Sequence, residues 1–502
     1  MKNKDYYVLI ITSLLCFTLF FLTQWFLLNF PDMLIDQLIF HILASKEGTS
    51  TELFILFFKD FSIEILKILP ILTVIIVLII NLKKTVILKI KFYNKKFGIK
   101  LFPIGNNSKF LRNCSFILLI FLMFWSFDKL GVDTYVKNQL NTSMIYENYY
   151  VDPREVKLKF PENKRNLIYI VLESMETSYS RYKTKGNITS LIPNLEELAE
   201  GNIYFSNNDE FGGALKMNLT SWTVSSLVSQ TAGVPLNIPI DGNSYEQYNT
   251  FLPKIITIGQ ILENAGYNQM FMMGSDSMFA GRKNYFEQHG NYKIWDYYTA
   301  IEKSKINKDY FQFWGFEDRK LFEFAKEEII KLSQQPQPFN FSLLTVDTHF
   351  FDGYLDDECK TIFDIQYANS IHCSDKKIKE FIEWIKNQEF YENTTIVLIG
   401  DHLTMDKKFV NRYIDNDKRT IYNAFINPAV TTDNTKNRHF SVIDMFPTTL
   451  ASLGVEIEGN KLGLGANLFS SEKTLIEEIG YDELNDEILK KSKYYIKNFL
   501  KK

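Results

Sequence analysis

The sequence predicts an N-terminal α-helical transmembrane region followed by an α/β domain with a mostly parallel, doubly wound sheet. Long uncharged segments lie within the first 131 residues. From residue 166 onward, short apolar runs alternate with amphipathic helical patterns, as in parallel sheets that helices cover on both faces. The length of 502 residues exceeds what one hydrophobic core usually organises, so two regions are expected.

Three segments near the start of the chain are long and apolar enough to cross a bilayer, at about 6–30, 63–82 and 113–131. The first is too long and too aromatic for a cleaved signal peptide. Residues 33–43 are shorter and contain an acid, so we expect an interfacial helix there. The region 1–131 is therefore predicted to be a multi-pass membrane region.

Charge in the loops predicts the orientation. Residues 83–112 contain nine Lys or Arg and no acid, whereas residues 30–62 contain five acids and two lysines. The positive-inside rule places residues 83–112 in the cytoplasm. An odd number of spans then exports the chain after about residue 132. We therefore expect a membrane protein whose α/β domain lies on the side opposite the cytoplasm.

The exported part divides into a linker at 132–165, an α/β domain at 166–475 and a helical tail at 476–502. The apolar runs predict strands at 166–172, 201–207, 267–273, 339–347, 394–400 and 420–427. The amphipathic patterns predict helices at 192–201, 255–266, 318–332, 376–388 and 442–454.

Two predicted strands end directly in groups that can bind a metal. Residues 166–172 lead into Glu173, and residues 394–400 lead into Asp401 and His402. In a doubly wound sheet, ligands bind at the carboxyl ends of the strands. Carboxylates and an imidazole at one edge can form a site of mixed oxygen and nitrogen ligands. The pattern predicts one divalent metal ion, zinc or manganese, with magnesium also suited.

Hydroxyl side chains cluster around the expected start of a helix within residues 212–236. Thr and Ser are ordinary N-cap residues, but a hydroxyl at a helix N-terminus also lies in a field that stabilises anions. We expect Thr220 to stand where the chain enters the helix and Thr223 to lie inside it. Thr220 is therefore the predicted nucleophile for phosphate chemistry.

Cysteine usage agrees with export. Cys359 and Cys373 are the two cysteines of the exported part, and they are close enough in sequence to close a short loop. We expect a disulfide between them. The alternative is a pair of buried free thiols.

Several motifs in order resemble one family. They are VLESME (171–176), LTSWTVSSLVSQTAGVPL (219–236), MFAGRKNYFEQHG (278–290), WGFEDRKLF (314–322), TVDTHFFDGYLDDEC (345–359), HCSDKKIKEFI (372–382) and GDHLTM (400–405). With them the chain resembles the membrane-anchored phosphoglycerol and phosphoethanolamine transferases of the alkaline phosphatase and sulfatase superfamily. That family includes lipoteichoic acid synthase and the phosphoglycerol transferase of osmoregulated periplasmic glucans. The likeness covers roughly residues 165–470.

The resemblance implies a role for particular residues. Metal ligands in the family match Glu173, Thr220, Asp401 and His402, and the nucleophile also matches Thr220. The family's phosphate-contacting histidine matches His349. The remaining matches are substrate-binding positions, at Arg282, Trp314 and Asp318.

The resemblance also implies a reaction. A phosphoglycerol or phosphoethanolamine group would pass from a membrane phospholipid, phosphatidylglycerol or phosphatidylethanolamine, to the threonine and then to a glycan. Two alternatives remain open: a phosphodiesterase that uses water as acceptor, and a non-catalytic protein that kept the fold. Sulfate ester hydrolysis is disfavoured, because no C-x-P-x-R or S-x-P-x-R motif is present. Phe350 stands where the glucan enzyme tends to have a second histidine.

Overall fold

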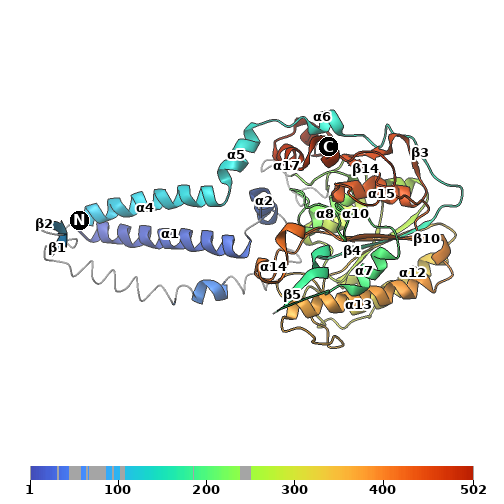
Figure 1. Ribbon diagram of the computed structural model, residues 1–502, viewed down its shortest axis with the longest axis horizontal. Coiled ribbons are helices and arrows are strands. Elements are labelled where there is room, and N and C mark those ends of the chain that lie inside the picture. Colours follow the sequence, from blue (N-terminus) through green and yellow to red (C-terminus); the bar gives the residue numbers. More distant parts are fainter. Residues whose placement is uncertain are drawn as a thin grey trace. The chain divides into compact units, whose positions relative to one another are not determined.

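The computed structural model describes residues 2–30, 33–43, 58–63, 66, 86–92, 95–101, 108–184, 186–237 and 250–500 (Figure 1). The chain forms two compact units. The first comprises residues 1–35 and 50–134, and the second comprises residues 36–49 and 135–502.

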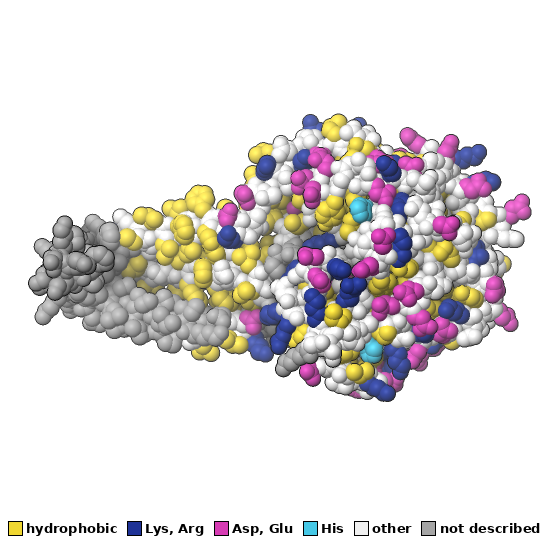
Figure 2. All heavy atoms as spheres, viewed as in Figure 1, with side chains coloured by type: hydrophobic (Ala, Val, Ile, Leu, Met, Phe, Trp, Pro, Cys, Tyr) yellow, Lys and Arg dark blue, Asp and Glu magenta, His cyan; other side chains and the backbone are white. Residues whose placement is uncertain are grey.

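The first unit is built on two long helices, α1 (Lys2–Asn29) and α4 (Ser108–Lys129). Thr12 Oγ1 lies 2.6 Å from Ser115 Oγ, and Thr23 Oγ1 donates to Ser126 Oγ at 2.9 Å. Both pairs are 103 residues apart in sequence, so the helices run parallel. Such buried hydroxyl pairs join helices where no water competes for the hydrogen bond. Figure 2 shows hydrophobic side chains along the exposed faces of these helices.

The predicted spans have different outcomes. In the described residues, Tyr7–Asn29 is long and apolar enough to cross a membrane, and Arg112–Lys129 followed by Val132–Leu140 passes the same test if the bent pair is one span. The predicted span at 63–82 lies outside the described residues, apart from positions 63 and 66. Two parallel helices can both cross a bilayer only if the chain between them crosses back. The predicted cytoplasmic loop contains an antiparallel hairpin of β1 (Val86–Phe92) and β2 (Lys95–Leu101).

The second unit is organised by a six-stranded sheet in the order β11-β10-β4-β9-β7-β8. The strands are β4 (Asn166–Leu172), β7 (Asn268–Met273), β8 (Lys293–Trp295), β9 (Phe339–Leu344), β10 (Thr394–Gly400) and β11 (Asn423–Ile426). Every neighbouring pair is parallel except β10 with β11. The predicted α/β fold class with a mostly parallel sheet is confirmed.

Helices cover both faces of this sheet. The helices on one face include α7 (Pro193–Glu200), α12 (Asp318–Ser333) and α13 (Gln366–Lys386). Those on the other face include α8 (Thr223–Ala232), α9 (Ile258–Asn264) and α15 (Met445–Ser452). Ile168 and Ile170 of β4 enter the first core, whereas Tyr169 and Val171 enter the second. Both faces of the central strand are buried, which explains its continuous apolar run.

Most predicted elements are present, with shifted ends. The helix predicted at 376–388 starts ten residues earlier, at Gln366 of α13. The strand predicted at 201–207 is wrong: this segment makes a single bridge, Ile203 with Phe425, beside the edge strand β11. An apolar run does not form a strand unless a partner edge lies alongside it for several residues.

The segments predicted as linker and tail are structured. Residues 132–165 contain α5 (Val132–Leu140), α6 (Ile145–Tyr149) and β3 (Leu158–Lys159), which pairs with β12 (Glu456–Ile457). The tail contains α17 (Tyr481–Leu489), α18 (Lys493–Tyr495) and a π-helical turn, η8 (Ile496–Leu500). Ile145, Tyr146 and Phe499 belong to the same hydrophobic core.

Cys359 and Cys373 form a disulfide with a Cα–Cα distance of 5.7 Å. The predicted pairing is confirmed. The bond ties the loop after β9 to α13.

Candidate functional site

Two parallel strands bring the predicted carboxylates together. β4 and β10 are paired in register so that Leu172 lies opposite Gly400. Glu173 and Asp401 are the next residues of each strand, and the Asp401 N–H still donates to the Leu172 carbonyl at 3.1 Å. A Cβ at Gly400 would lie 2.1 Å from the Met175 carbonyl oxygen. Only glycine allows this close approach of the end of β10 to the loop that follows β4.

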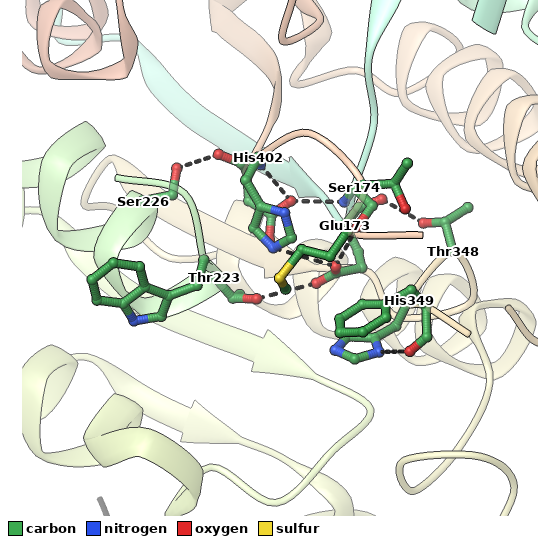
Figure 3. Close-up of polar contacts among 12 residues, drawn as sticks. Glu173, Ser174, Thr223, Ser226, Thr348, His349 and His402 are labelled. Atoms are coloured by element: carbon green, nitrogen blue, oxygen red, sulfur yellow. Dashed lines mark hydrogen bonds and ion pairs between the residues drawn. The ribbon is translucent and has the colours of Figure 1, made fainter. Parts of the chain in front are cut away.

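Glu173, Asp401 and His402 form a buried cluster in which one ligand atom of each lies within 4.8 Å of the others. His402 Nε2 is 3.6 Å from Glu173 Oε1 and 3.3 Å from Asp401 Oδ2. All three residues are at most 2% exposed. Figure 3 shows Glu173 and His402 facing one another at this edge of the sheet.

The orientation of the ligand atoms fits a cation. His402 Nδ1 bonds to the Leu403 carbonyl at 3.0 Å, which directs Nε2 into the cluster. Asp401 Oδ1 accepts from the backbone N–H groups of Ser174 and His402, each at 2.7 Å, which leaves Oδ2 for the cluster. Asp401 Oδ2 and His402 Nε2 are buried and have no hydrogen-bond partner among the described residues. Buried polar atoms rarely remain unpaired, so these two atoms fit the ligand set of a metal ion.

The electrostatics of the cluster also fit a bound cation. Burial raises the pKa of the Asp401 carboxyl to about 7, and the Glu173 carboxylate adds to this rise. Burial alone would raise the pKa of Glu173, but His349 and His402 hold it below its ordinary value. Burial lowers the pKa of His402, and the two carboxylates more than offset that effect, so its pKa is raised. Without a metal, the cluster favours a shared proton, and a divalent cation would neutralise the same two carboxylates.

The predicted position of the reactive threonine changes. The helix α8 begins at Thr223, so the prediction that Thr220 stands at the helix start, with Thr223 inside it, is wrong. Thr223 Oγ1 donates to Glu173 Oε2 at 3.3 Å, whereas Thr220 Oγ1 donates to the Met217 carbonyl at 2.9 Å (Figure 3). Thr220 is bonded within its own turn because Leu219, with φ of 58°, reverses the chain just before it. The structure therefore brings Thr223, and not Thr220, to the cluster.

The first two turns of α8 are bonded to the backbone of Gly400 and Asp401, at the end of β10. Ser226 Oγ donates to the Asp401 carbonyl at 2.5 Å, and Gln230 Nε2 donates to the Gly400 carbonyl at 3.2 Å. Tyr169 of β4 donates to Gln230 Oε1 at 3.0 Å. These contacts set the rotation of the helix, and so the direction of the Thr223 hydroxyl. Sequence reasoning noted the hydroxyl residues of this helix but not these contacts.

His349 lies beside the cluster, as predicted for a phosphate contact (Figure 3). Its Nδ1 bonds to the Phe350 carbonyl at 2.6 Å, which leaves Nε2 for a substrate. Burial lowers the pKa of His349, so the imidazole is an acceptor near neutral pH. The Trp314 ring centroid is 4.7 Å from that of His349. The Phe350 ring stacks on His349, with 4.9 Å between the ring centroids.

Arg282 begins α10 (Arg282–Gln288) and is buried. Its Nη2 donates to Ser275 Oγ at 3.1 Å and to the Asp276 carbonyl at 2.6 Å, and Nε donates to the Phe279 carbonyl at 3.1 Å. Burial lowers the pKa of Arg282 to about 10, so the guanidinium keeps its charge at neutral pH. The Glu173 carboxylate acts to raise the pKa of Arg282, so this cation lies within electrostatic reach of the cluster.

Asp318, for which the resemblance predicts a substrate contact, is bonded to the backbone of a neighbouring turn. Its two carboxylate oxygens accept from the backbone N–H groups of Val346 at 2.8 Å and Asp347 at 3.0 Å. Lys377 Nζ lies 3.0 Å from Asp347 Oδ2 in the same turn and 3.3 Å from Asp356 Oδ2. Both Asp318 oxygens therefore hold the turn that precedes His349, and the substrate contact stays a prediction.

Two further features beside the cluster, an ion pair and a strained residue, were not predicted from the sequence. Glu176 and Arg419 form a buried bidentate ion pair, with Nε to Oε2 at 2.7 Å and Nη2 to Oε1 at 2.8 Å. Arg419 Nη2 also donates to the carbonyl of Thr404, two residues after His402, at 2.8 Å. Ser174 adopts a φ of 50° directly after Glu173, a strained conformation typical of functional sites. Glu176, the second glutamate of VLESME, was visible in the sequence, but its partner Arg419 lies 243 residues away.

The comparisons with known proteins agree with this architecture. The sequence model of the sulfatase family matches residues 165–455, more than half of the 502 residues. The chain belongs to the sulfatase family, within the alkaline phosphatase and sulfatase superfamily that the motifs predicted.

Among relatives, the chain is 31% identical over 335 residues to phosphoglycerol transferase I from Salmonella choleraesuis, over 64% of this chain and 41% of the relative. It thus spans about two fifths of the relative's length. Two solved structures are also similar. One is the lipoteichoic acid synthase LtaP from Listeria monocytogenes (TM-score 0.49, 20% identity, 65% of this chain and 80% of that chain). The other is the integral membrane protein lipooligosaccharide phosphoethanolamine transferase A (EptA) from Neisseria meningitidis (TM-score 0.49, 13% identity, 89% and 84%).

Proposed function

We propose that this protein is a metal-dependent transferase that moves a phosphoglycerol group from a membrane phospholipid to a glycan hydroxyl through a covalent adduct on Thr223. One observation carries the proposal: the Thr223 hydroxyl faces a buried Glu, Asp and His cluster in which Asp401 Oδ2 and His402 Nε2 have no hydrogen-bond partner among the described residues. A hydroxyl at a helix N-terminus beside such a cluster is suited to phosphate chemistry.

The metal ligands in this proposal are Glu173, Asp401, His402 and Thr223, in place of the predicted Thr220. Three oxygen donors and one nitrogen donor suit zinc or manganese, and magnesium also fits. A bound divalent cation would favour the alkoxide form of Thr223 and offset negative charge on the phosphate oxygens.

The chain's own groups account for a two-step transfer. In the first step the bond from Thr223 Oγ1 to phosphorus forms, the bond from phosphorus to the diacylglycerol oxygen breaks, and the threonine proton ends on that oxygen. In the second step an acceptor hydroxyl attacks phosphorus, the bond to Thr223 breaks, and the acceptor's proton restores the threonine. His349 Nε2 is the group suited to carry these protons, and Arg282 to offset charge on the phosphate.

The substrates follow from the relatives and the anchor. Phosphoglycerol is favoured by the 31% identity to phosphoglycerol transferase I, although phosphoethanolamine fits the same mechanism. The donor would be phosphatidylglycerol, or phosphatidylethanolamine for the second head group, and the acceptor a glycan of the cell envelope. A donor that stays in the bilayer explains why the enzyme would carry membrane-spanning helices.

Mass spectrometry tests the proposal. The full chain in detergent is incubated with phosphatidylglycerol or phosphatidylethanolamine without acceptor, and peptides are mapped. We expect an adduct on Thr223 whose mass reports the head group, and its loss when a glycan is added. Release at the same rate in water and with glycan would instead indicate a phosphodiesterase. No adduct with either lipid would contradict the proposal.

We also propose that the protein crosses the bacterial inner membrane more than once and that residues after 132 lie on the periplasmic or extracellular side. The parallel direction of α1 and α4 supports a return crossing between them. A reporter fused after Lys100 should read cytoplasmic, and one fused after Lys502 should read external. The reverse pattern would contradict this topology.

A further inference from the structure

The segment at residues 481–500 packs into the catalytic core. Leu484, Ile488, Tyr495 and Phe499 are at most 2% exposed and belong to the core that also contains α8. The helix α8 presents Thr223, so the contacts of this segment beside that helix bear on the direction of the Thr223 hydroxyl.

The segment holds the chain just before α8. Asn485 Oδ1 accepts from the Asn218 backbone N–H at 2.8 Å, and the Asn485 carbonyl accepts from Asn218 Nδ2 at 3.4 Å. Tyr481 OH donates to the Lys216 carbonyl at 2.6 Å. Asn218 lies five residues before Thr223, so these bonds fix the approach to the helix.

The same segment holds the chain just after α8. Tyr495 OH donates to the Pro235 carbonyl at 3.1 Å and accepts from the Asn237 backbone N–H at 3.2 Å. Asn237 Nδ2 donates to the Ile488 carbonyl at 3.3 Å. Both flanks of α8 are therefore bonded to one segment that lies more than 240 residues away in sequence.

The two flanks also meet each other at a strained residue. The Leu236 N–H donates to the Leu219 carbonyl at 3.1 Å, and Leu219 is fully buried with a φ of 58°. A branched residue in the left-handed region persists only where its surroundings hold it. Asn485 holds Asn218, the residue directly before this strained turn, and the turn sets where α8 begins.

The segment contacts the residues that follow the predicted membrane region as well. Ser143 Oγ donates to Glu487 Oε2 at 2.7 Å, and the Ser143 N–H donates to the Lys491 carbonyl at 3.0 Å. The Tyr146 ring lies 5.7 Å from Phe499 and 5.4 Å from Tyr495. One segment thus joins residues 143–146 to the flanks of α8.

We propose that Asn485 and Tyr495 are positioning residues that hold the strained turn at Leu219 and thereby aim the Thr223 hydroxyl at the metal cluster. The proposal rests on the proposed role of Thr223. Neither residue touches the cluster itself, so both act through α8. Small displacements of a nucleophile reduce its reaction rate strongly even when the substrate still binds.

The first test measures how fast the lipid-derived adduct forms on Thr223 in the full chain in detergent, in single turnovers with phosphatidylglycerol. The variants are Asn485→Leu, which removes the acceptor for the Asn218 N–H, Asn485→Asp, which keeps that acceptor and loses only the Nδ2 donor to the Tyr481 carbonyl, and Tyr495→Phe. Tyr494→Phe is the matched control, because the Tyr494 hydroxyl makes no hydrogen bond within the part of the chain that the structure describes, while its ring packs 6.1 Å from Tyr146.

We expect Asn485→Leu and Tyr495→Phe to slow adduct formation by at least about tenfold with unchanged metal content and unchanged lipid affinity. Asn485→Asp and Tyr494→Phe should react like the wild type. Equal rates in all five proteins would overturn the inference. Tyr495→Phe changes a single oxygen, so it remains informative if Asn485→Leu fails to fold.

A second measurement does not depend on the proposed function. Hydrogen exchange of the full chain should show faster exchange at residues 219–226 in Asn485→Leu and Tyr495→Phe, with α12 and α13 unchanged. Unchanged exchange at residues 219–226 would overturn the positioning role even if labelling of Thr223 succeeds. Faster exchange together with no adduct in the wild type would support the positioning role and contradict the proposed function instead.

Discussion

Thr223 Oγ1 donates a hydrogen bond to Glu173 Oε2 across 3.3 Å, and this contact joins the start of α8 to the end of β4. The two residues lie 50 positions apart in sequence. Thr220, only three residues earlier, is bonded to the Met217 carbonyl instead. The contact therefore favours Thr223, whereas the sequence pattern had favoured Thr220.

The first prediction separates these threonines. Thr223→Val removes the hydroxyl with little change of shape, and we expect it to abolish the covalent adduct and lower turnover by about three orders of magnitude or more. Thr220→Val should keep the adduct and lose about 1 kcal/mol of stability, because it removes one intramolecular hydrogen bond. Peptide mapping and steady-state turnover check both. An adduct on Thr220, or full activity of Thr223→Val, would show that the nucleophile is misplaced.

The second prediction concerns the metal. Asp401→Asn and His402→Gln each weaken a ligand, so the purified variants should contain far less metal by elemental analysis than the wild type. A metal that binds only the folded state stabilises it by about 4 kcal/mol when its concentration is a thousand times Kd. Chelation removes this stabilisation, so it should lower the melting temperature of the wild type.

Asp406→Asn is the control for this loop. Its carboxylate accepts from the Phe409 N–H at 3.0 Å and caps α14 (Lys407–Tyr413) outside the cluster. This variant should keep its metal. A metal content that falls equally in Asp406→Asn, or that persists in His402→Gln, would argue against the assigned ligands.

The third prediction addresses the buried pair of Glu176 and Arg419. Arg419→Met leaves the Glu176 carboxylate without its charged partner at a site with 0% exposure, so we expect a loss of about 3–5 kcal/mol of stability. The double variant Glu176→Gln with Arg419→Met removes both charges and should recover much of that loss. Chemical unfolding of the three proteins measures the difference. If the double variant is less stable than Arg419→Met alone, the loss has another cause.

The fourth prediction is a dependence of stability on pH. His289 is 2% exposed, its Nε2 lies 2.6 Å from the Phe251 carbonyl oxygen, and burial lowers its pKa to about 4. The ordinary value is about 6.5, so protonation favours the unfolded chain. The neutral imidazole's contribution is fully present above pH 6.5 and is lost as the pH falls toward 4, by about 3 kcal/mol.

His289→Gln does not titrate, so it provides the comparison. The free energy of unfolding of the wild type should fall more steeply from pH 7 to pH 4 than that of this variant, by about 3 kcal/mol. Parallel curves would show that His289 is not the titrating group.

Several features followed from the sequence alone because they depend on neighbouring residues. The apolar run at 166–172 predicts a buried strand, and a buried parallel strand presents its next residue at the carboxyl edge of the sheet. Glu173 and Asp401 were placed at one edge by this reasoning, and the register of Leu172 with Gly400 agrees. The spacing of the two cysteines likewise predicted a disulfide that is present.

Other features could be decided only by contacts between distant parts of the chain. A helix start within residues 219–223 is ambiguous locally, since hydroxyl residues are favoured at several positions of a first turn. The left-handed turn at Leu219 and the bond from Ser226 to Asp401 determine that α8 begins at Thr223. The bonds of Asp318 to the Val346 and Asp347 amides likewise could not be expected from the sequence, where Asp318 was predicted only as a substrate contact.

The physical reason is the range of the forces involved. Hydrophobic periodicity and strand ends are set over a few residues, so the sequence determined the sheet, its functional edge and the ligand types. The direction of a side chain depends on hydrogen bonds and packing with residues that are distant in the sequence. The tertiary structure therefore decided which threonine faces Glu173, and that residues 481–500 hold the helix that carries it.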